Sequence, residues 1–148
     1  MPGFTTSFLI PDINVWIALS HARHVHHHVA TDWLESMEPT VRLSFCRFTQ
    51  IGFLRLLTSQ AVMGEDVLTQ AEAWAHYDRW LKNDNVNLID EPPGVESRFR
   101  ALARSRQTSP KSFGDAYIAA FAETSQMTLV TFDRAFGSKV RDVLLLEE

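Results

Sequence analysis

The sequence predicts an α/β fold in which a central parallel sheet lies between helices. Short strand-like runs alternate with longer helical patterns along the chain, which is the order expected of strand–helix–strand units. Residues 129–132 form an apolar, β-branched and aromatic run, as in a strand that is covered on both faces. Residues 116–122 are small and apolar almost all round, so the helix predicted at residues 112–123 also lies in the interior.

The individual elements follow from local patterns and from the turn-forming residues between them. The short apolar or alternating runs predict strands at residues 7–10, 40–44, 86–90, 129–132 and 143–146. The longer runs with apolar faces predict helices at residues 13–19, 29–37, 45–57, 65–81, 95–106 and 112–123. Turn-forming residues separate these elements, as at Pro11-Asp12, residues 59–64, Asn83-Asp84-Asn85, Glu91-Pro92-Pro93-Gly94, Thr108-Ser109-Pro110 and residues 134–137.

Length and composition limit the classes of protein to which the chain can belong. The 148 residues, of which 45% are hydrophobic, predict one domain spanning residues 1–148 with a substantial core. The formal net charge of -4 gives no overall basic character. Cys46 is the only cysteine, so we expect no internal disulfide and a reducing, cytoplasmic location. No apolar run is long enough to span a membrane, so no membrane partner is expected.

Aspartates follow three of the predicted strands, and a fourth begins the interior helix. They are Asp12, Asp90, Asp133 and Asp115. The carboxyl ends of parallel strands meet at one edge of a sheet, which is where sites form in open α/β folds. Converging carboxylates repel one another unless a cation neutralises them, and hard oxygen ligands suit Mg²⁺ or Mn²⁺. Two such ions, about 3.5–4 Å apart, can activate water and stabilise the leaving oxygen of a phosphodiester.

Each of these carboxylates also has a purely structural interpretation. Asp12 is well suited to cap the helix that follows it. Ser112-x-x-Asp115 fits a capping box, in which Asp115 receives backbone N–H groups. Asp133 precedes Arg134 and fits turn chemistry, and Asp90 fits a loop.

Five histidines occur between the first and second predicted helices, at positions 21, 24, 26, 27 and 28. His24 and His28 have the i,i+4 spacing of zinc ligands, but no Glu completes an H-E-x-x-H pattern and no Cys pair is nearby. The histidines His21, His24, His26, His27 and His28 are therefore interpreted as a polar connection at a helix start.

A basic strip without acidic residues lies between Ser97 and Gly114. It comprises Arg98, Arg100, Arg104, Arg106 and Lys111. Such a strip beside an acidic site suits a polyanion that must meet metal ions. The alternative is a solvated helix face.

The aspartate motifs resemble those of a known nuclease family. Three stretches are similar to the acidic motifs of PIN-domain nucleases: Pro11-Asp12-Ile13-Asn14-Val15-Trp16, Phe113-Gly114-Asp115-Ala116-Tyr117-Ile118-Ala119-Ala120 and Leu129-Val130-Thr131-Phe132-Asp133. The stretches at residues 47–58, 61–64 and 73–81 resemble one branch of the VapC-type toxins of bacterial toxin–antitoxin pairs. Together these stretches extend over nearly the whole chain.

This resemblance implies a three-layer α/β/α PIN-like domain that acts as a metal-dependent endoribonuclease. The implied substrate is structured RNA such as tRNA or rRNA, cut by two-metal-type hydrolysis with Mg²⁺ or Mn²⁺, and the side chains of the basic strip would be its RNA-binding residues. The implied partners are a cognate antitoxin and a second copy of the chain in a homodimer. By residue, the resemblance makes Asp12, Asp115 and Asp133 metal ligands, with Asn14 and Thr131 in support. Asp90 has no counterpart among the family's acids.

One position departs from the family pattern. Most PIN nucleases carry a Glu in the second motif, where this chain has Gln50. An amide can coordinate or donate a hydrogen bond, but it brings no charge, so a second metal ion would be weakened most. Gln50 is kept as a catalytic candidate.

Two other functions compete with the nuclease. One is a catalytically weak or inactive PIN-like module that binds RNA or a protein. The other is an unrelated acidic-pocket protein such as a phosphatase or a receiver domain, which would need a suitable Lys late in the chain. Lys139 is the only late Lys, and its surroundings fit that role poorly.

Overall fold

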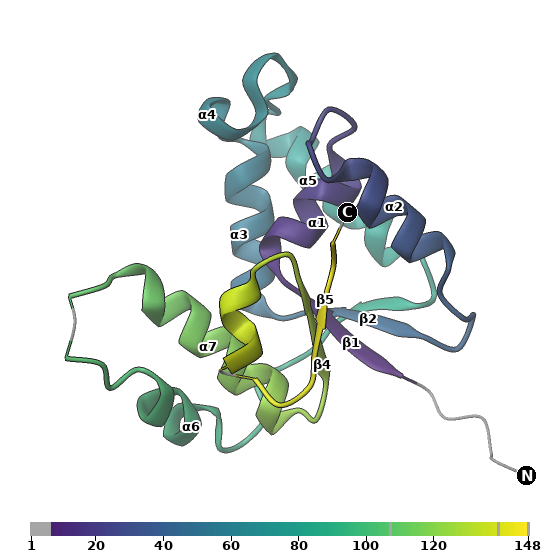
Figure 1. The fold of residues 1–148 in the computed structure, drawn as a ribbon. Helices are drawn as coiled ribbons and strands as arrows, with labels where there is room; N and C mark the ends of the chain where they lie inside the picture. Colours follow the sequence, from purple (N-terminus) through teal and green to yellow (C-terminus); the bar gives the residue numbers. More distant parts are fainter. Residues whose placement is uncertain (1–6, 107, 139, 148) are drawn as a thin grey trace, which may run out of the picture.

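The computed structural model describes residues 7–106, 108–138 and 140–147, so Lys139 lies outside the described residues. Within them, five strands form a single sheet in the order β3-β2-β1-β4-β5 (Figure 1). Every neighbouring pair is parallel, as predicted. The strands are β1 (Phe8–Pro11), β2 (Arg42–Phe45), β3 (Val86–Leu88), β4 (Thr128–Thr131) and β5 (Val143–Leu145).

Helices cover both faces of the sheet, which gives the three-layer arrangement (Figure 1). One face is covered by α1 (Ile13–Ser20), α2 (His27–Glu35), α3 (Arg47–Leu57) and α5 (Gln70–Leu81), and the other by α6 (Val95–Leu102) and α7 (Lys111–Thr124). The shorter helical segments are the α-helix α4 (Gln60–Met63) and the 3-10 helices η1 (Gly64–Asp66) and η2 (Arg134–Ser138). No helix among the described residues is long and apolar enough to cross a membrane.

Alternating residues of the central strands divide the core into two parts. Leu9 and Val130 are buried with the helices of the first face, whereas Ile10 and Leu129 are buried against α7. Successive residues of a strand point to opposite faces, so a strand that is apolar throughout is covered on both sides. The apolar runs of β1 and β4 therefore place these two strands at the centre of the molecule.

Several predicted boundaries were wrong, each for a local reason. Phe45 ends β2 instead of beginning a helix, and its ring stacks on Trp16 at 3.9 Å between centroids. The helix predicted from residue 65 starts at Gln70, because Thr69 and Glu72 exchange hydrogen bonds in a capping box. The stretch at 59–64, predicted as a loop, contains α4 and the start of η1. The helix predicted to reach residue 106 ends at Leu102.

The capping box predicted at Ser112 and Asp115 does not form. The helix α7 begins one residue earlier, at Lys111, and the Ser112 hydroxyl donates to the Ser109 carbonyl oxygen at 2.8 Å. Asp115 therefore lies beyond the first turn of α7, where capping does not account for its carboxylate. Asp90 is exposed and follows the end of β3 at Leu88, so it does not close the strand as predicted.

The strand order places a topological switch point between β1 and β4. From β1 the chain proceeds to β2 and β3 on one side of the sheet, whereas β4 and β5 lie on the other side. In open parallel sheets, the crevice at the carboxyl ends of such a strand pair is where ligands bind. Asp12 and Asp133 follow these two strands.

Candidate metal and nuclease site

Asp12 joins β1 to α1, and its backbone N–H and both of its carboxylate oxygens form hydrogen bonds. Its backbone N–H donates to the Val130 carbonyl oxygen of β4 at 2.8 Å. Its Oδ1 accepts from the Ile13 N–H at 2.7 Å as the cap of α1, so the predicted capping role is confirmed. Its Oδ2 accepts from the Thr131 hydroxyl at 3.0 Å. The carboxylate is therefore fixed in orientation by both strands of the switch point.

Thr131 connects Asp12 to Asp133. Its side chain is fully buried at the end of β4, and its Oγ1 accepts from the Asp133 backbone N–H at 3.0 Å while donating to Asp12. Asp133 in turn accepts from the Ala135 N–H through Oδ1 at 2.9 Å, which fits the turn chemistry expected there. A single hydroxyl thus sets the relative positions of the two strand-end aspartates.

The three predicted ligands Asp12, Asp115 and Asp133 are electrostatically coupled. Burial raises the pKa of the Asp12 carboxyl above its ordinary value, and the hydrogen bonds from Ile13 and Thr131 offset only part of that rise. The neighbouring carboxylates of Asp115 and Asp133 raise the pKa of Asp12 further. The fold therefore brings Asp115 of α7 and Asp133 after β4 close enough to Asp12 for their charges to act on it.

The chemistry of these ligands suits a hard divalent cation, because all of them are carboxylate oxygens. In the described part of the chain, however, no three His, Cys, Asp or Glu side chains lie close enough together to form a ready metal-binding group. Asp115 and Asp133 nevertheless act electrostatically on Asp12, and a bound cation would relieve that repulsion.

Gln50 is buried in α3, and its described contacts run along its own helix and to α5. Its Oε1 accepts from the Arg47 Nη1 at 2.6 Å. Burial raises the pKa of the Tyr77 hydroxyl, and the adjacent Gln50 amide and Arg47 guanidinium offset part of that rise. Gln50 thus lies between Arg47 and Tyr77, and its catalytic role stays a prediction. The same holds for Asn14, which is exposed in the first turn of α1.

The basic strip spans α6 and the start of α7, and its members differ in their contacts. Arg98 forms an ion pair with Glu123 of α7 at 2.7 Å, which ties the two helices together. Arg100 pairs with Glu96 of its own helix at 3.2 Å, with both side chains largely exposed. Arg104, Arg106 and Lys111 are exposed. The RNA-binding role of the strip stays a prediction.

The histidines contact one another as well as other residues: the centroid of the His24 ring lies 6.4 Å from that of His21 and 5.7 Å from that of His26. His21 bonds to Asp66 at 3.0 Å, and His27 to the Ala18 carbonyl oxygen at 2.6 Å. His26 stacks on Phe132, directly before Asp133, with ring centroids 4.5 Å apart and planes at 18°. This stack, which no sequence pattern indicated, packs the connection between α1 and α2 against the end of β4.

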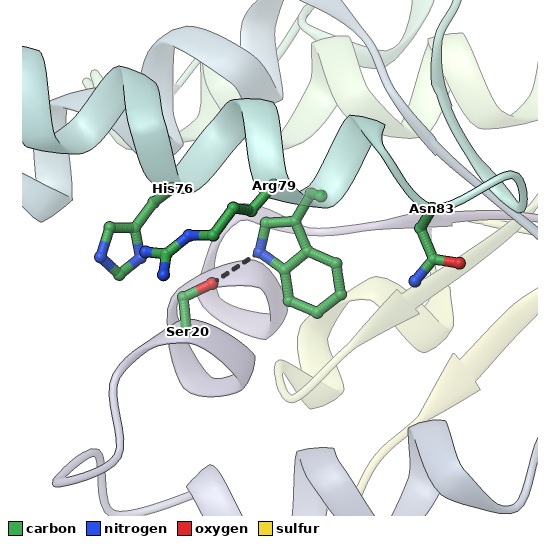
Figure 2. Close-up of a pocket in the computed structure, with 5 residues that line it drawn as sticks. Ser20, His76, Arg79 and Asn83 are labelled. Carbon is green, nitrogen blue, oxygen red and sulfur yellow. Dashed lines mark hydrogen bonds between the residues drawn. The ribbon is translucent and has the colours of Figure 1, made fainter.

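A separate hollow of about 370 Å³ lies at the far end of α1 from Asp12 (Figure 2). It is lined by Ser20, His76, Arg79, Trp80 and Asn83, and the Trp80 Nε1 donates to the Ser20 hydroxyl at 2.8 Å. It contains no carboxylate. The chemistry proposed for the aspartates therefore does not extend to this hollow.

Comparisons with known proteins agree with the geometry at the switch point. A family model described as the PIN domain matches residues 9–141. Ribonuclease VapC41 of Mycobacterium tuberculosis is 43% identical over 132 residues, which cover 86% of this chain and 90% of that protein. The residues matched by the family model include Asp12, Asp115 and Asp133.

Solved structures support the same fold at lower identity. A chain of the VapBC2 complex from Rickettsia felis, bound to a DNA fragment from its promoter, matches with a TM-score of 0.69 and 12% identity, over 95% of this chain and 99% of that chain. VapC20 of Mycobacterium tuberculosis, described as a sarcin-ricin loop cleaving toxin, matches with a TM-score of 0.67 and 18% identity, over 88% and 93% of the two chains. The predicted three-layer PIN-like fold is confirmed.

Proposed function

This chain belongs to the PIN-domain family, and we propose that it is a metal-dependent endoribonuclease that acts as the toxin of a toxin–antitoxin pair. One observation carries the proposal. Asp12 and Asp133 are joined through Thr131 at the topological switch point, and Asp115 lies close enough to raise the pKa of Asp12. Carboxylates arranged in this way suit a nuclease whose metal ions are held by the protein and whose nucleophile is water.

In this proposal Asp12, Asp115 and Asp133 hold Mg²⁺ or Mn²⁺. The bound ion supplies a water of lowered pKa and a positive charge for the leaving oxygen of the phosphodiester. Thr131 orients Asp12, and the cap on α1 fixes its second oxygen. Gln50 adds no charge, so a second ion would depend more on the substrate phosphate than on the protein.

The proposed substrate is structured RNA, either tRNA or rRNA. Support comes from VapC41, which is named a ribonuclease, and from VapC20, which is described as cleaving the sarcin-ricin loop. The matched chains of VapBC complexes support a cognate antitoxin as the partner. We further propose a homodimer and a cytoplasmic location, both of which follow from the same family membership.

A cleavage assay tests the proposal directly. The purified chain is incubated with total tRNA and with ribosomal RNA in the presence of Mn²⁺, beside the variants Asp115→Asn and Asp90→Asn. Discrete metal-dependent cuts are expected from the wild type and from Asp90→Asn, because Asp90 is an exposed loop residue outside the site. Asp115→Asn is expected to lose at least about a hundredfold in rate, in line with the loss of a preorganised electrostatic group.

The outcomes separate the competing functions. Cuts that persist in Asp115→Asn would remove this aspartate from the site. No cutting by any variant, together with no binding of Mn²⁺, would favour the catalytically inactive module. Gln50 supports that second function, because an amide at this position leaves three carboxylates where most PIN nucleases have four, and its oxygen already accepts a hydrogen bond from Arg47.

A further inference from the structure

An open hollow of about 320 Å³ lies between α6 and the start of α7, outside the cluster of aspartates. Its lining consists of two aromatic rings, two guanidinium groups and one methyl group, from Phe99, Arg100, Ala103, Arg104 and Phe113. We refer to it as the aromatic hollow. None of its lining residues is acidic.

Phe113 leaves an unusual amount of aromatic surface in water. The residue is 57% exposed, more than Phe8 at 50% or Trp74 at 48%. The Phe99 ring meets Phe113 at 6.3 Å and 80°. An edge-to-face contact of this kind holds the Phe113 ring in place and covers at most one of its faces. An exposed and preoriented ring face is therefore available to a ligand.

The charge around this ring face is positive. Arg100 and Arg104 line the same hollow. Glu96 offsets part of the charge of Arg100, but both side chains are more than two-thirds exposed, so the pair is weak and easily exchanged. A ligand that fits must combine a flat apolar face with negative charge beside it. A nucleotide does so, because its base stacks while its phosphate meets the guanidinium groups.

The position of the hollow connects it to the proposed active site. Phe113 precedes Asp115 by two residues on α7, so the two side chains share one end of the helix and point to different sides of it, because a helix turns once in about 3.6 residues. Phe99 also contacts Tyr117 one turn further along, at 5.6 Å, which fixes α6 against this part of α7. The aromatic hollow and Asp115 therefore lie at the same end of α7.

We infer that the aromatic hollow binds an unpaired base of the RNA substrate next to the cleavage site, with Phe113 as the stacking surface and Arg100 and Arg104 as contacts to the adjacent phosphates. This inference rests on the proposed function. It predicts a preference for RNA with unpaired nucleotides, because the bases of a duplex are stacked on one another and cannot enter the hollow.

Equilibrium binding tests the inference separately from cleavage. The probes are a random-sequence single-stranded RNA of twelve nucleotides carrying 2-aminopurine and a duplex of the same length, both in EDTA so that no metal-dependent cutting occurs. Phe113→Ala is expected to weaken single-strand binding about tenfold, as is usual for loss of one base–aromatic stack. Phe113→Tyr is expected to bind as the wild type does, and Phe8→Ala, which removes a similarly exposed ring elsewhere, is the matched control.

Salt dependence distinguishes the two kinds of contact. The logarithm of the association constant for RNA falls as the logarithm of the salt concentration rises. Arg100→Gln and Arg104→Gln are each expected to make this slope less steep by about 0.7, the value for one phosphate contact on a single strand. Phe113→Ala is expected to leave this slope unchanged and to abolish the fluorescence change of 2-aminopurine on binding.

Three results would overturn the inference. They are an absence of measurable RNA binding by the wild type, an equal loss of affinity in Phe113→Ala and Phe8→Ala, and unchanged RNA binding in Phe113→Ala accompanied by an altered mass in gel filtration. The last result would assign Phe113 to a protein contact. The nuclease proposal is judged by the cleavage assay with Asp115→Asn, so either proposal can fail while the other stands.

Discussion

Asp12 is a residue whose position in the proposed site disfavours the charged form of its own carboxyl. Burial and the neighbouring carboxylates of Asp115 and Asp133 raise the pKa of its carboxyl. A raised carboxyl pKa means that the folded chain binds the proton more tightly than the unfolded chain does. The contribution of Asp12 to stability is therefore most favourable below the ordinary Asp pKa of 3.8, and it is lost as pH rises through the interval up to the raised pKa.

Asp12→Asn is therefore expected to be more stable than the wild type at pH 7 in the presence of a chelator, although it should be inactive. Asn is as good a helix cap as Asp, so the contact to Ile13 is preserved without the buried charge. Thermal unfolding between pH 4 and pH 8 measures the effect, with Asp90→Asn as the exposed control. A lower Tm for Asp12→Asn at pH 7 would show that its hydrogen bonds outweigh the repulsion.

Thr131→Val tests the hydroxyl that joins the two strand-end aspartates. Valine keeps the shape and strand preference of threonine but leaves Oδ2 of Asp12 without its donor and the Asp133 N–H without its acceptor. Loss of stability by about 1–3 kcal/mol is expected for groups left unsatisfied in this way. Urea unfolding measures it, and Thr131→Ser, which keeps the hydroxyl, should recover most of the difference. Equal losses in both variants would point to packing and not to the hydrogen bonds.

At the scale of elements, local pattern predicted the central strands, their parallel pairing and the aspartates at their ends. It did not predict the link through Thr131, because that link depends on β1 and β4 being neighbours, and the sheet order is set by tertiary packing. The aromatic hollow was missed for a similar reason. Phe99 and Phe113 are fourteen positions apart, and an apolar residue in a helix is indistinguishable by pattern from a core residue until α6 packs on α7.

The contact between α1 and α3 gives a prediction at this scale. A Cβ atom at Gly52 of α3 would fall within 2.7 Å of Cγ1 of Ile13, the residue after Asp12. Gly52→Ala is expected to destabilise the fold by about 1–3 kcal/mol through overpacking, although alanine is the better helix former. Chemical denaturation measures the loss.

Two further variants identify the cause of that loss. Gly137→Ala, where nothing lies within 4 Å of the added atom, should be close to neutral. Ile13→Val removes Cδ1, the atom nearest the new methyl group, so the double variant should lose less stability than the sum of its single changes. Strict additivity would mean that α1 and α3 adjust without strain.

At the scale of the whole molecule, the site lies where the two parts of the core meet. The helices α1 and α3 pack on one face of the sheet and α7 packs on the other, and the three aspartates reach the switch point from both sides. Packing on both faces thus holds like charges near one another. The repulsion between these charges is the reason to expect that a bound cation stabilises the fold.

Mg²⁺ or Mn²⁺ is accordingly expected to raise the Tm of the wild-type chain. A ligand that binds only the folded state stabilises it by about 2.7 kcal/mol at a hundredfold excess over its Kd. The rise should vanish in Asp12→Asn and persist in Asp90→Asn, because only the former removes a predicted ligand. An equal rise in Asp12→Asn would place the ion elsewhere on the surface. Because the readout is unfolding and not cleavage, it identifies the metal site whether or not the right RNA is at hand.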